Sequence, residues 1–420
     1  MPKRILMIAY HYPPNAGSSG VHRTLKFSQY LLEMGWLPSV LTVHPRVYEA
    51  WDARQLSEIP SQVEVKRAFA LDSAKHMSIA GRYPGLLALP DRWSSWVLGG
   101  FFAAWFLIRR QRPDVIWATF PISSAILIAI LLKMWFKLPL VIDLRDPMTK
   151  PGYPAGRLKY RLTRWIEEKA VSLCEYAVFT THSTCAMYQQ RYPDIDTDKW
   201  RVIANGYDEE SFQQTVASLD IADIKSKHGG KLVFLHSGVL YPNERDPAQF
   251  FQALAELKRE GAINAATLQI VLRATMHDEI FKPDLAQLGI EDMVLLQPNI
   301  PYKDALAEML SVDGLLIFQA ASCNAQIPAK AYEYIRAGQP ILALTDAVGD
   351  TANLLTSAGY NRIAALDNRS EIKRCLLEFI DDIKHKRAYA CDASHAYQYS
   401  RRARSEELAK LLDSVELKRD

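Results

Sequence analysis

Apolar residues follow two alternating patterns along the chain. Short uninterrupted apolar runs are typical of strands buried on both faces of a parallel sheet, and segments with apolar residues at helical spacing separate them. The runs are residues 3–10, 38–43, 114–119, 140–144, 176–181, 231–238, 268–273, 314–319 and 341–344. The alternation predicts an α/β protein, and the opening strand, helix and strand predict a doubly wound sheet, whose ligands gather at the carboxyl ends of its strands.

The clearest strand-loop-helix-strand unit spans Gly314 to Leu344. A strand and a polar loop lead to Pro328, which suits the first turn of a helix because its missing N–H costs nothing there. Gly338 can take the left-handed conformation that ends a helix. A helix N-terminus after a polar loop offers unpaired N–H groups and the positive end of a dipole, so it favours an anion, most often phosphate.

Two charged side chains lie near the start of this helix. Lys330 is in the first turn, where a cation gains nothing from the helix dipole, so its presence favours a bound anion. Glu333 follows one turn later and can accept two hydrogen bonds from a vicinal diol such as a ribose. An ordinary surface helix with one lysine and one glutamate is the alternative.

The composition is that of an ordinary soluble protein. The 420 residues are 49% hydrophobic and 23% charged, and the length suffices for two domains with separate cores. Five scattered cysteines without a C-x-x-C pair indicate neither a disulfide framework nor a zinc site. The N-terminal apolar run is shorter than a signal-peptide core, so we expect a cytoplasmic protein.

Charge is distributed unevenly between the two halves. Residues 1–205 carry 26 Lys and Arg against 16 Asp and Glu, a net +10, whereas residues 206–420 carry 24 against 31, a net −7. A basic half favours an acidic partner, either an anionic bilayer or a phosphorylated substrate. Nucleic acid is not indicated, because the charge is spread out and no nucleic-acid-binding motif is present.

A glycine-bearing loop follows the first strand. Gly17 and Gly20 lie just before Arg23 and the predicted first helix, residues 19–34. They do not match G-x-G-x-x-G, so the sequence contains no dinucleotide fingerprint at this point. A flexible turn is the alternative to a binding loop.

The segment DLRDP places Asp143, Arg145 and Asp146 at the carboxyl end of a strand. There they can contact a ligand, or form an Asp–Arg ion pair that only braces the loop. A basic helix is predicted next, over residues 155–173, and it either presents a solvated face or contacts an anionic acceptor or membrane. Its cations are Arg157, Lys159, Arg161 and Arg164.

Two apolar segments, Val97–Ile108 and Ile122–Phe136, are shorter than the ~18 residues that a membrane-spanning helix needs. Burial against the sheet explains both. The alternative is a helix that lies in the headgroup region, because aromatic and cationic side chains flank the first segment. These are Trp93, Trp96, Trp105, Arg109, Arg110 and Arg112.

Asp194, Asp196 and Asp198 have the D-x-D spacing of carboxylates that can hold Mg²⁺ or Mn²⁺. No apolar strand leads into this segment, and it follows a predicted helix end at Tyr192. We therefore expect no metal site here.

The stretch from Gln326 to Leu344, QIPAKAYEYIRAGQPILAL, resembles the carboxy-terminal signature of the retaining GT-B glycosyltransferases of family 4, bacterial polysaccharide type. Glu333, Ala337, Gly338 and Pro340 match this signature. The glycine loop, DLRDP, the VIANG segment and the last helix add weaker similarity, so the resemblance spans nearly the whole chain.

The resemblance implies two doubly wound Rossmann-like domains that face a cleft. The expected parts are an acceptor-side domain (1–205), a linker (206–230), a nucleotide-sugar-binding domain (231–385) and a C-terminal helical segment (386–420) that packs back on the first domain.

Residue roles follow from the same resemblance. The expected donor-binding residues are Glu333, Gly17, Gly20, Arg273, Asn324, Gln326 and Ala329. Arg245 and Lys330 are the expected catalytic residues, which would stabilise the leaving diphosphate without a metal or cofactor. The expected acceptor-side residues are Arg23, Asp143, Arg145 and Asp146.

The sequence departs from the family pattern at two positions. Ala325 stands where a second glutamate usually faces the donor sugar, and Phe120 stands where relatives often carry a histidine. No general base is therefore assigned, and His236 is interpreted as a structural histidine of its strand.

The resemblance implies retaining transfer of a hexose-type sugar from a nucleotide-diphosphate donor to a growing cell-surface polysaccharide or a lipid-linked acceptor. The enzyme would be cytoplasmic or peripheral on the inner face of the membrane. Two alternatives stay open. One is a non-catalytic nucleotide-sugar-binding subunit, and the other is a sugar-nucleotide epimerase or hydrolase on the same fold.

Overall fold

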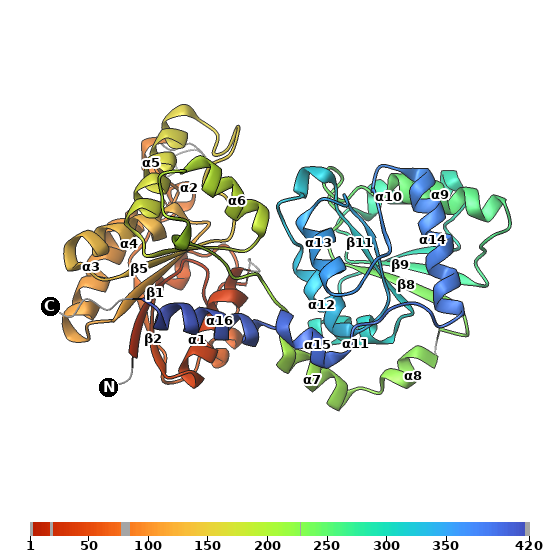
Figure 1. Cartoon of the computed structure of the whole chain (residues 1–420), viewed down its shortest axis with the longest axis horizontal. Coiled ribbons are helices and arrows are strands. Elements are labelled where there is room, and N and C mark those ends of the chain that lie inside the picture. The colour runs from red at the N-terminus through yellow and green to blue at the C-terminus, as the bar shows by residue number, and fades with distance from the viewer. Residues whose placement is uncertain (1–2, 17–19, 77–84, 227, 416–420) are drawn as a thin grey trace. The chain divides into compact units, whose positions relative to one another are not determined.

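The computed structural model describes residues 3–16, 20–76, 85–226 and 228–415. The chain forms two compact units: unit 1 contains Met1–Ala204 and Arg401–Asp420, and unit 2 contains Asn205–Ser400. Each unit has one parallel sheet with helices packed against it (Figure 1). The predicted α/β, doubly wound architecture is thus confirmed in both units.

Unit 1 is built on a seven-stranded sheet with the order β3-β2-β1-β4-β5-β6-β7. All neighbouring strands pair in parallel. The strands are β1 (Lys3–Ile8), β2 (Trp36–Val43), β3 (Glu64–Ala68), β4 (Val115–Phe120), β5 (Leu140–Leu144), β6 (Tyr176–Phe179) and β7 (Trp200–Val202). The helices are α1 (Gly20–Glu33), α2 (Ser73–His76), α3 (Ser95–Arg110), α4 (Ser123–Phe136), α5 (Arg157–Leu173), α6 (His182–Arg191) and α16 (Arg401–Asp413).

The central strand β1 shows why its sequence is apolar throughout. Ile5 and Met7 pack into the core beneath α1 and α16, whereas Leu6 and Ile8 pack into the core beneath α3 and α4. Side chains alternate between the two faces of a strand, so a strand with helices on both sides must be apolar at every position.

Unit 2 is built on a six-stranded sheet with the order β10-β9-β8-β11-β12-β13. Its strands are β8 (Leu232–Ser237), β9 (Leu268–Arg273), β10 (Val294–Gln297), β11 (Gly314–Phe318), β12 (Ile341–Leu344) and β13 (Ile363–Ala364). Its helices are α7 (Glu209–Ser218), α8 (Ile221–Ser226), α9 (Ala248–Arg259), α10 (Asp278–Leu288), α11 (Tyr302–Ser311), α12 (Ala329–Ala337), α13 (Asp350–Ser357), α14 (Arg369–Lys384) and α15 (Ala393–Ala396).

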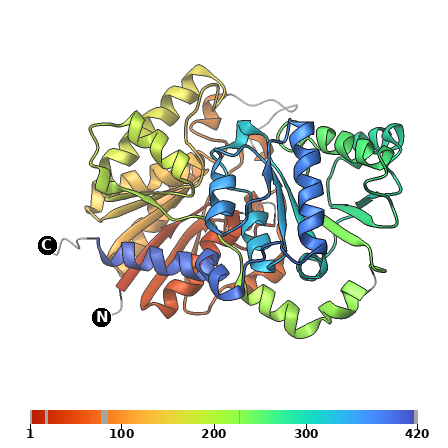
Figure 2. The ribbon, with the colours of Figure 1, turned by 45° about the vertical axis from the view of Figure 1, so that its right-hand side comes forward.

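The segments that join the units differ in part from expectation. Residues 206–230 were predicted to be a linker, but they form α7 and α8, which pack against α11 within unit 2. Of the C-terminal segment, residues up to Ser400 belong to unit 2 and only the part from Arg401 belongs to unit 1. There α16 lies beside α1, and Leu408 and Leu412 are buried (Figures 1 and 2).

The apolar segments of unit 1 form α3 and α4, and both helices bury one side against the sheet. Within the described part of the chain, no helix combines the length and apolar character needed to cross a bilayer.

Candidate functional site

The N-terminus of α12 lies beyond the carboxyl end of β11, as the sequence predicted. Pro328 occupies the N-cap position with φ −64° and ψ 139°, and no described side chain caps this end of the helix. At the other end Gly338 takes the left-handed conformation with φ 67°. The first-turn amides therefore form the kind of terminus that favours an anion.

Lys330, on the first turn of α12, contacts a histidine of the neighbouring strand. Its Nζ lies 2.8 Å from Nε2 of His236, which is fully buried on β8. The Nδ1 of this ring is 2.9 Å from the carbonyl oxygen of Leu316. Since that oxygen can only accept, Nδ1 carries the proton and Nε2 accepts from the lysine. The interpretation of His236 as a structural histidine is thus incomplete, because it also positions Lys330.

Gly238 makes room for the lysine amine. The φ angle of Gly238 is +119°, which residues other than glycine rarely adopt. A Cβ atom at this position would lie 3.1 Å from the Nζ of Lys330. The loop after β8 and the amine are therefore closely packed at this point.

Arg245 is the second cation of this cluster. It follows the same loop, donates a hydrogen bond of 2.9 Å to the carbonyl of Val239, and stacks 5.3 Å from the ring centre of Tyr241. Burial and then the charge of Arg245 lower the pKa of Lys330 well below its usual value, whereas Glu333 raises it. Burial and the charge of Lys330 likewise lower the pKa of His236, which is therefore neutral. A cluster of this sign favours an anionic ligand.

Glu333 is partly exposed on α12 and accepts a hydrogen bond of 2.9 Å from the hydroxyl of Tyr302, the first residue of α11. Arg273, at the end of β9, forms an ion pair with Glu308 and donates to the carbonyl of Pro298. The Arg273 side chain is thus tied to α11 and to the loop after β10.

The residues predicted to contact the donor sugar are held in the loop before α12. The side-chain NH₂ of Asn324 donates to Asp346 at 2.7 Å, and the backbone carbonyl of Asn324 accepts from the backbone amide of Asp350 at 2.8 Å. The carbonyl of Gln326 accepts from Thr351, while its side chain is exposed. Ala329 is the exposed first residue of α12.

A cavity of about 470 Å³ lies near the carboxyl ends of β11, β12 and β13. Three carboxylates line it, those of Asp246, Asp346 and Asp367. A diphosphate is disfavoured against such a lining, so the anion site of unit 2 is better placed at Lys330 and Arg245.

In unit 1, the expected acceptor-side residues Arg23 and Asp143 form a buried ion pair. Arg23, on α1, meets both carboxylate oxygens of Asp143 at 2.7 and 3.2 Å, and Asp143 is fully buried at the end of β5. Thr119 also donates to this carboxylate at 2.9 Å. The ion pair considered within DLRDP therefore forms with Arg23 and not with Arg145.

Arg145 instead contacts the end of β4 and the glycine loop. It donates a hydrogen bond of 2.8 Å to the carbonyl of Phe120, and its Nη2 lies 3.5 Å from Nδ1 of His11. A Cβ on Gly20 would come within 2.2 Å of this guanidinium, which explains the glycine at the start of α1. Asp146 is exposed, and Gly17 lies outside the described residues.

His11 was missed by the sequence reasoning. It lies three residues after the end of β1, at the edge where ligands gather in such sheets, and this position was the available signal. Burial, and then the charge of Arg145, lower the pKa of His11 to about 4, so the imidazole is neutral near pH 7.

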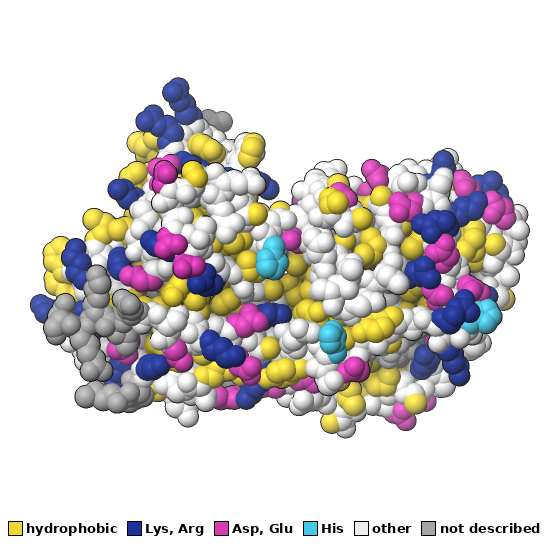
Figure 3. All heavy atoms as spheres, viewed as in Figure 1, with side chains coloured by type: hydrophobic (Ala, Val, Ile, Leu, Met, Phe, Trp, Pro, Cys, Tyr) yellow, Lys and Arg dark blue, Asp and Glu magenta, His cyan; other side chains and the backbone are white. Residues whose placement is uncertain are grey.

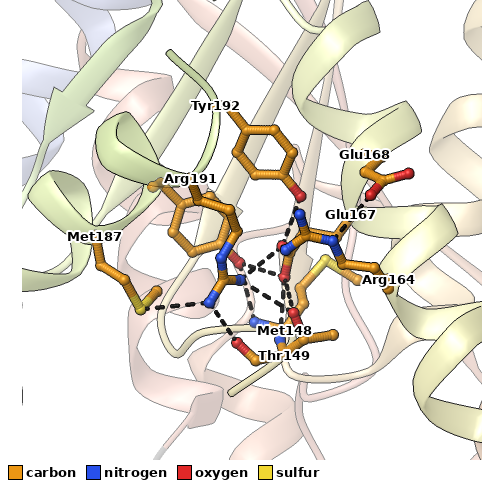
Figure 4. Close-up of polar contacts among 9 residues, drawn as sticks. Met148, Thr149, Arg164, Glu167, Glu168, Met187, Arg191 and Tyr192 are labelled. Carbon is orange, nitrogen blue, oxygen red and sulfur yellow. Dashed lines mark hydrogen bonds and ion pairs between the residues drawn. The ribbon is translucent and has the colours of Figure 1, made fainter. Parts of the chain in front are cut away.

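A buried carboxylate on α5 braces the loop that follows β5 (Figure 4). Glu167 is fully buried and accepts hydrogen bonds from the loop, from α6 and its C-cap residue, and from its own helix. The donors are Thr149, Arg164, Tyr188, Arg191 and Tyr192. Arg164, predicted to belong to a solvated or acceptor-binding face, is thus turned to Glu167 and also to Glu168.

The D-x-D segment lies in an exposed turn after α6. Asp196 caps a short 3₁₀ helix by accepting from the amide of Asp198 at 2.9 Å. Among the described residues, no group of three or more His, Cys, Asp or Glu is arranged to hold a metal ion.

Two parallel Rossmann-like sheets of seven and six strands, with the last helix packed on the first unit, define a GT-B fold. Residues 23–211 match the family model described as Glycosyltransferase Family 4. A search of curated proteins found no match.

Solved structures share this fold over almost their whole length. Anabaena HepE in complex with UDP is 14% identical, with 98% of this chain and 100% of that chain covered and a TM-score of 0.67. Sucrose-phosphate synthase from Thermosynechococcus elongatus is 11% identical, with 98% of both chains covered and a TM-score of 0.66. A Listeria monocytogenes protein with the provisional name UDP-N-acetylglucosamine 2-epimerase is 14% identical, with coverages of 99% and 96% and a TM-score of 0.60. These structures show that the chain has the GT-B fold, and the family model matches residues 23–211 of it.

Proposed function

We propose that the protein transfers a hexose-type sugar from a nucleotide-diphosphate donor, with retention of anomeric configuration. One observation carries the proposal: the loop after β8 holds both cations near the N-terminus of α12, since Lys330 packs against Gly238 and Arg245 donates to the carbonyl of Val239, and Glu333 follows on the same helix. This arrangement offers cations and amides to a diphosphate and a carboxylate to a ribose. The complexes of Anabaena HepE with UDP and with UDP-glucose support a uridine nucleotide as the first donor to test.

The chemical demand of the reaction fits these residues. Departure of the diphosphate from an oxocarbenium-like carbon builds negative charge on the leaving group, and fixed positive groups stabilise such charge most effectively when they are already in place. Lys330 contacts His236, and Arg245 donates to the carbonyl of Val239, so both side chains are already ordered before the donor binds. We propose that these groups act without a metal.

We further propose a growing cell-surface polysaccharide or a lipid-diphosphate-linked saccharide as the acceptor. The net +10 charge of residues 1–205 supports an anionic acceptor, and it supports a location on the inner face of the cytoplasmic membrane. Arg145 and His11 are the unit 1 side chains whose position at strand ends suits acceptor contact.

Donor consumption separates this proposal from its alternatives. The purified protein is incubated with a panel of nucleotide sugars, with and without a membrane lipid extract, and products are identified by mass spectrometry. A transferase consumes donor quickly only with the extract and forms a glycosylated lipid or saccharide. An epimerase or hydrolase consumes donor equally well alone, and a binding subunit consumes none, so either result overturns the proposal.

A further inference from the structure

The outer side of α3 in unit 1 is apolar although it does not face the core. Leu98, Phe102 and Phe106 are 69%, 49% and 72% exposed and follow one another at four-residue spacing, so they form one stripe. The opposite side of the helix is buried against the sheet. Figure 3 shows the apolar side chains gathered at the left-hand edge, over α3. A helix that covers a sheet needs one apolar side, and α3 has two.

The stripe continues onto α4 through aromatic contacts. The ring of Trp135 lies 6.4 Å from Phe101 and 6.0 Å from Trp105, both of which belong to α3. Trp135 is 65% exposed and Met134 is 57% exposed. The two helices therefore present one continuous surface, the α3–α4 ridge, formed by Leu98, Phe101, Phe102, Trp105, Phe106, Met134 and Trp135. Contiguous apolar surface of this kind usually marks an interaction site.

Cations gather at the ends of the ridge, and two of them, Arg110 and Lys133, form ion pairs with Glu64 and Glu175. Between Ser95 and Lys137 the sequence contains five Lys and Arg and a single acid, Asp114, which accepts from the backbone of Arg4. Arg109 lies in the last turn of α3 and Lys137 is the C-cap residue of α4, and both residues are exposed. Neither α3 nor α4 contains an acid, and aromatic side chains next to exposed cations such as Arg109 and Lys137 match the headgroup region of an anionic bilayer.

A second copy of the chain fits this surface less well. A two-fold interface would bring the ridge against itself, and neither α3 nor α4 carries an acid that could face the arginines of the other copy. A bilayer with anionic lipids supplies both the apolar layer and the negative charge.

We propose that the α3–α4 ridge docks unit 1 on an anionic lipid bilayer, with its aromatic side chains at the boundary between headgroups and acyl chains. This inference rests on the membrane location proposed above and names the surface responsible for it; vesicle binding needs neither donor nor turnover, so its test can fail while sugar transfer is confirmed.

Sedimentation of the full chain with vesicles tests the proposal. The vesicles contain phosphatidylcholine with about one third phosphatidylglycerol, and pure phosphatidylcholine serves as the comparison. The wild type is expected to sediment with the anionic vesicles. The triple variant Phe102→Ser/Phe106→Ser/Trp135→Ser is expected to lose at least tenfold in partition coefficient, because each change removes an exposed aromatic group that has no role in the core.

Matched controls separate the ridge from general surface hydrophobicity. The triple variant Met276→Ser/Ile280→Ser/Val348→Ser removes comparably exposed apolar residues from unit 2 and is expected to bind as the wild type does. A circular dichroism spectrum and a urea-unfolding midpoint close to those of the wild type show that the ridge variant is folded.

Three outcomes overturn the proposal. The wild type can stay in the supernatant at low salt, or the ridge variant can bind as tightly as the wild type. The third is a wild-type dimer in analytical ultracentrifugation that the ridge variant converts to a monomer, since that result assigns the ridge to a second copy.

Discussion

Replacing Glu333 with glutamine exchanges one carboxylate oxygen for an NH₂ group and so tests whether this carboxylate binds the donor. The change keeps the shape of the side chain and one acceptor oxygen, and it removes the negative charge that two ribose hydroxyls would meet. Glu333 is partly exposed and accepts a hydrogen bond from the hydroxyl of Tyr302, which the amide oxygen of glutamine can also accept. Hydrogen bonds to charged groups contribute ~1.5 to 3 kcal/mol, which corresponds to roughly a ten- to hundredfold loss of affinity.

Isothermal titration with the best-binding nucleoside diphosphate measures this loss, and the matching 2′-deoxy nucleotide locates it. The wild type should discriminate against the 2′-deoxy nucleotide, and Glu333→Gln should discriminate less, because its neutral amide oxygen accepts a weaker hydrogen bond from the 2′-hydroxyl than the carboxylate does. The matched control Tyr302→Phe leaves the carboxylate in place, so we expect its affinity to stay within about threefold of the wild type. Equal discrimination by the wild type and Glu333→Gln would refute the ribose assignment.

Three further predictions concern the metal, the unit 1 brace and pH. Donor turnover should survive excess EDTA. If EDTA instead abolishes turnover, Mn²⁺ restores it and Asp196→Asn removes the restored activity, a metal at the D-x-D segment is favoured. Glu167→Gln should lower the free energy of unfolding in urea by roughly 3 to 5 kcal/mol, because it leaves Arg191 without its buried partner; a change below about 1 kcal/mol would contradict the brace. Because the pKa of His11 is lowered to about 4, the unfolded state binds more protons below pH 6.5, and stability should fall as pH drops from 6.5 toward 4. His11→Gln should show a smaller loss over this range, and an identical pH profile would refute the assignment.

The parts of the fold that the sequence predicted well carry strong local signals. The strands from Gly314 and Ile341 and the helix between them agree with the structure to within about a residue. Buried parallel strands must be apolar throughout, so their extent can be read from the sequence. Pro328 and Gly338 mark the two ends of α12, so local residues determine the helix boundaries as well.

The parts that were missed depend on contacts between distant residues. Strand β3, with the sequence EVKRA, lies at the edge of its sheet, where few apolar side chains are needed. The pairing of Arg23 with Asp143 joins residues 120 positions apart, and that of Lys330 with His236 joins residues 94 positions apart. Spacing along the chain carries no information about such partners, so the sequence named the residues but not their pairs.

The central claim is that Lys330 and Arg245 form the diphosphate subsite of unit 2. The most direct test compares the affinities of a nucleoside diphosphate and the matching monophosphate, by titration calorimetry, for the wild type and for Lys330→Met. If the lysine meets the terminal phosphate, the wild type prefers the diphosphate, and the variant loses roughly tenfold or more of that preference while its monophosphate affinity changes little. An unchanged preference in the variant would contradict the account.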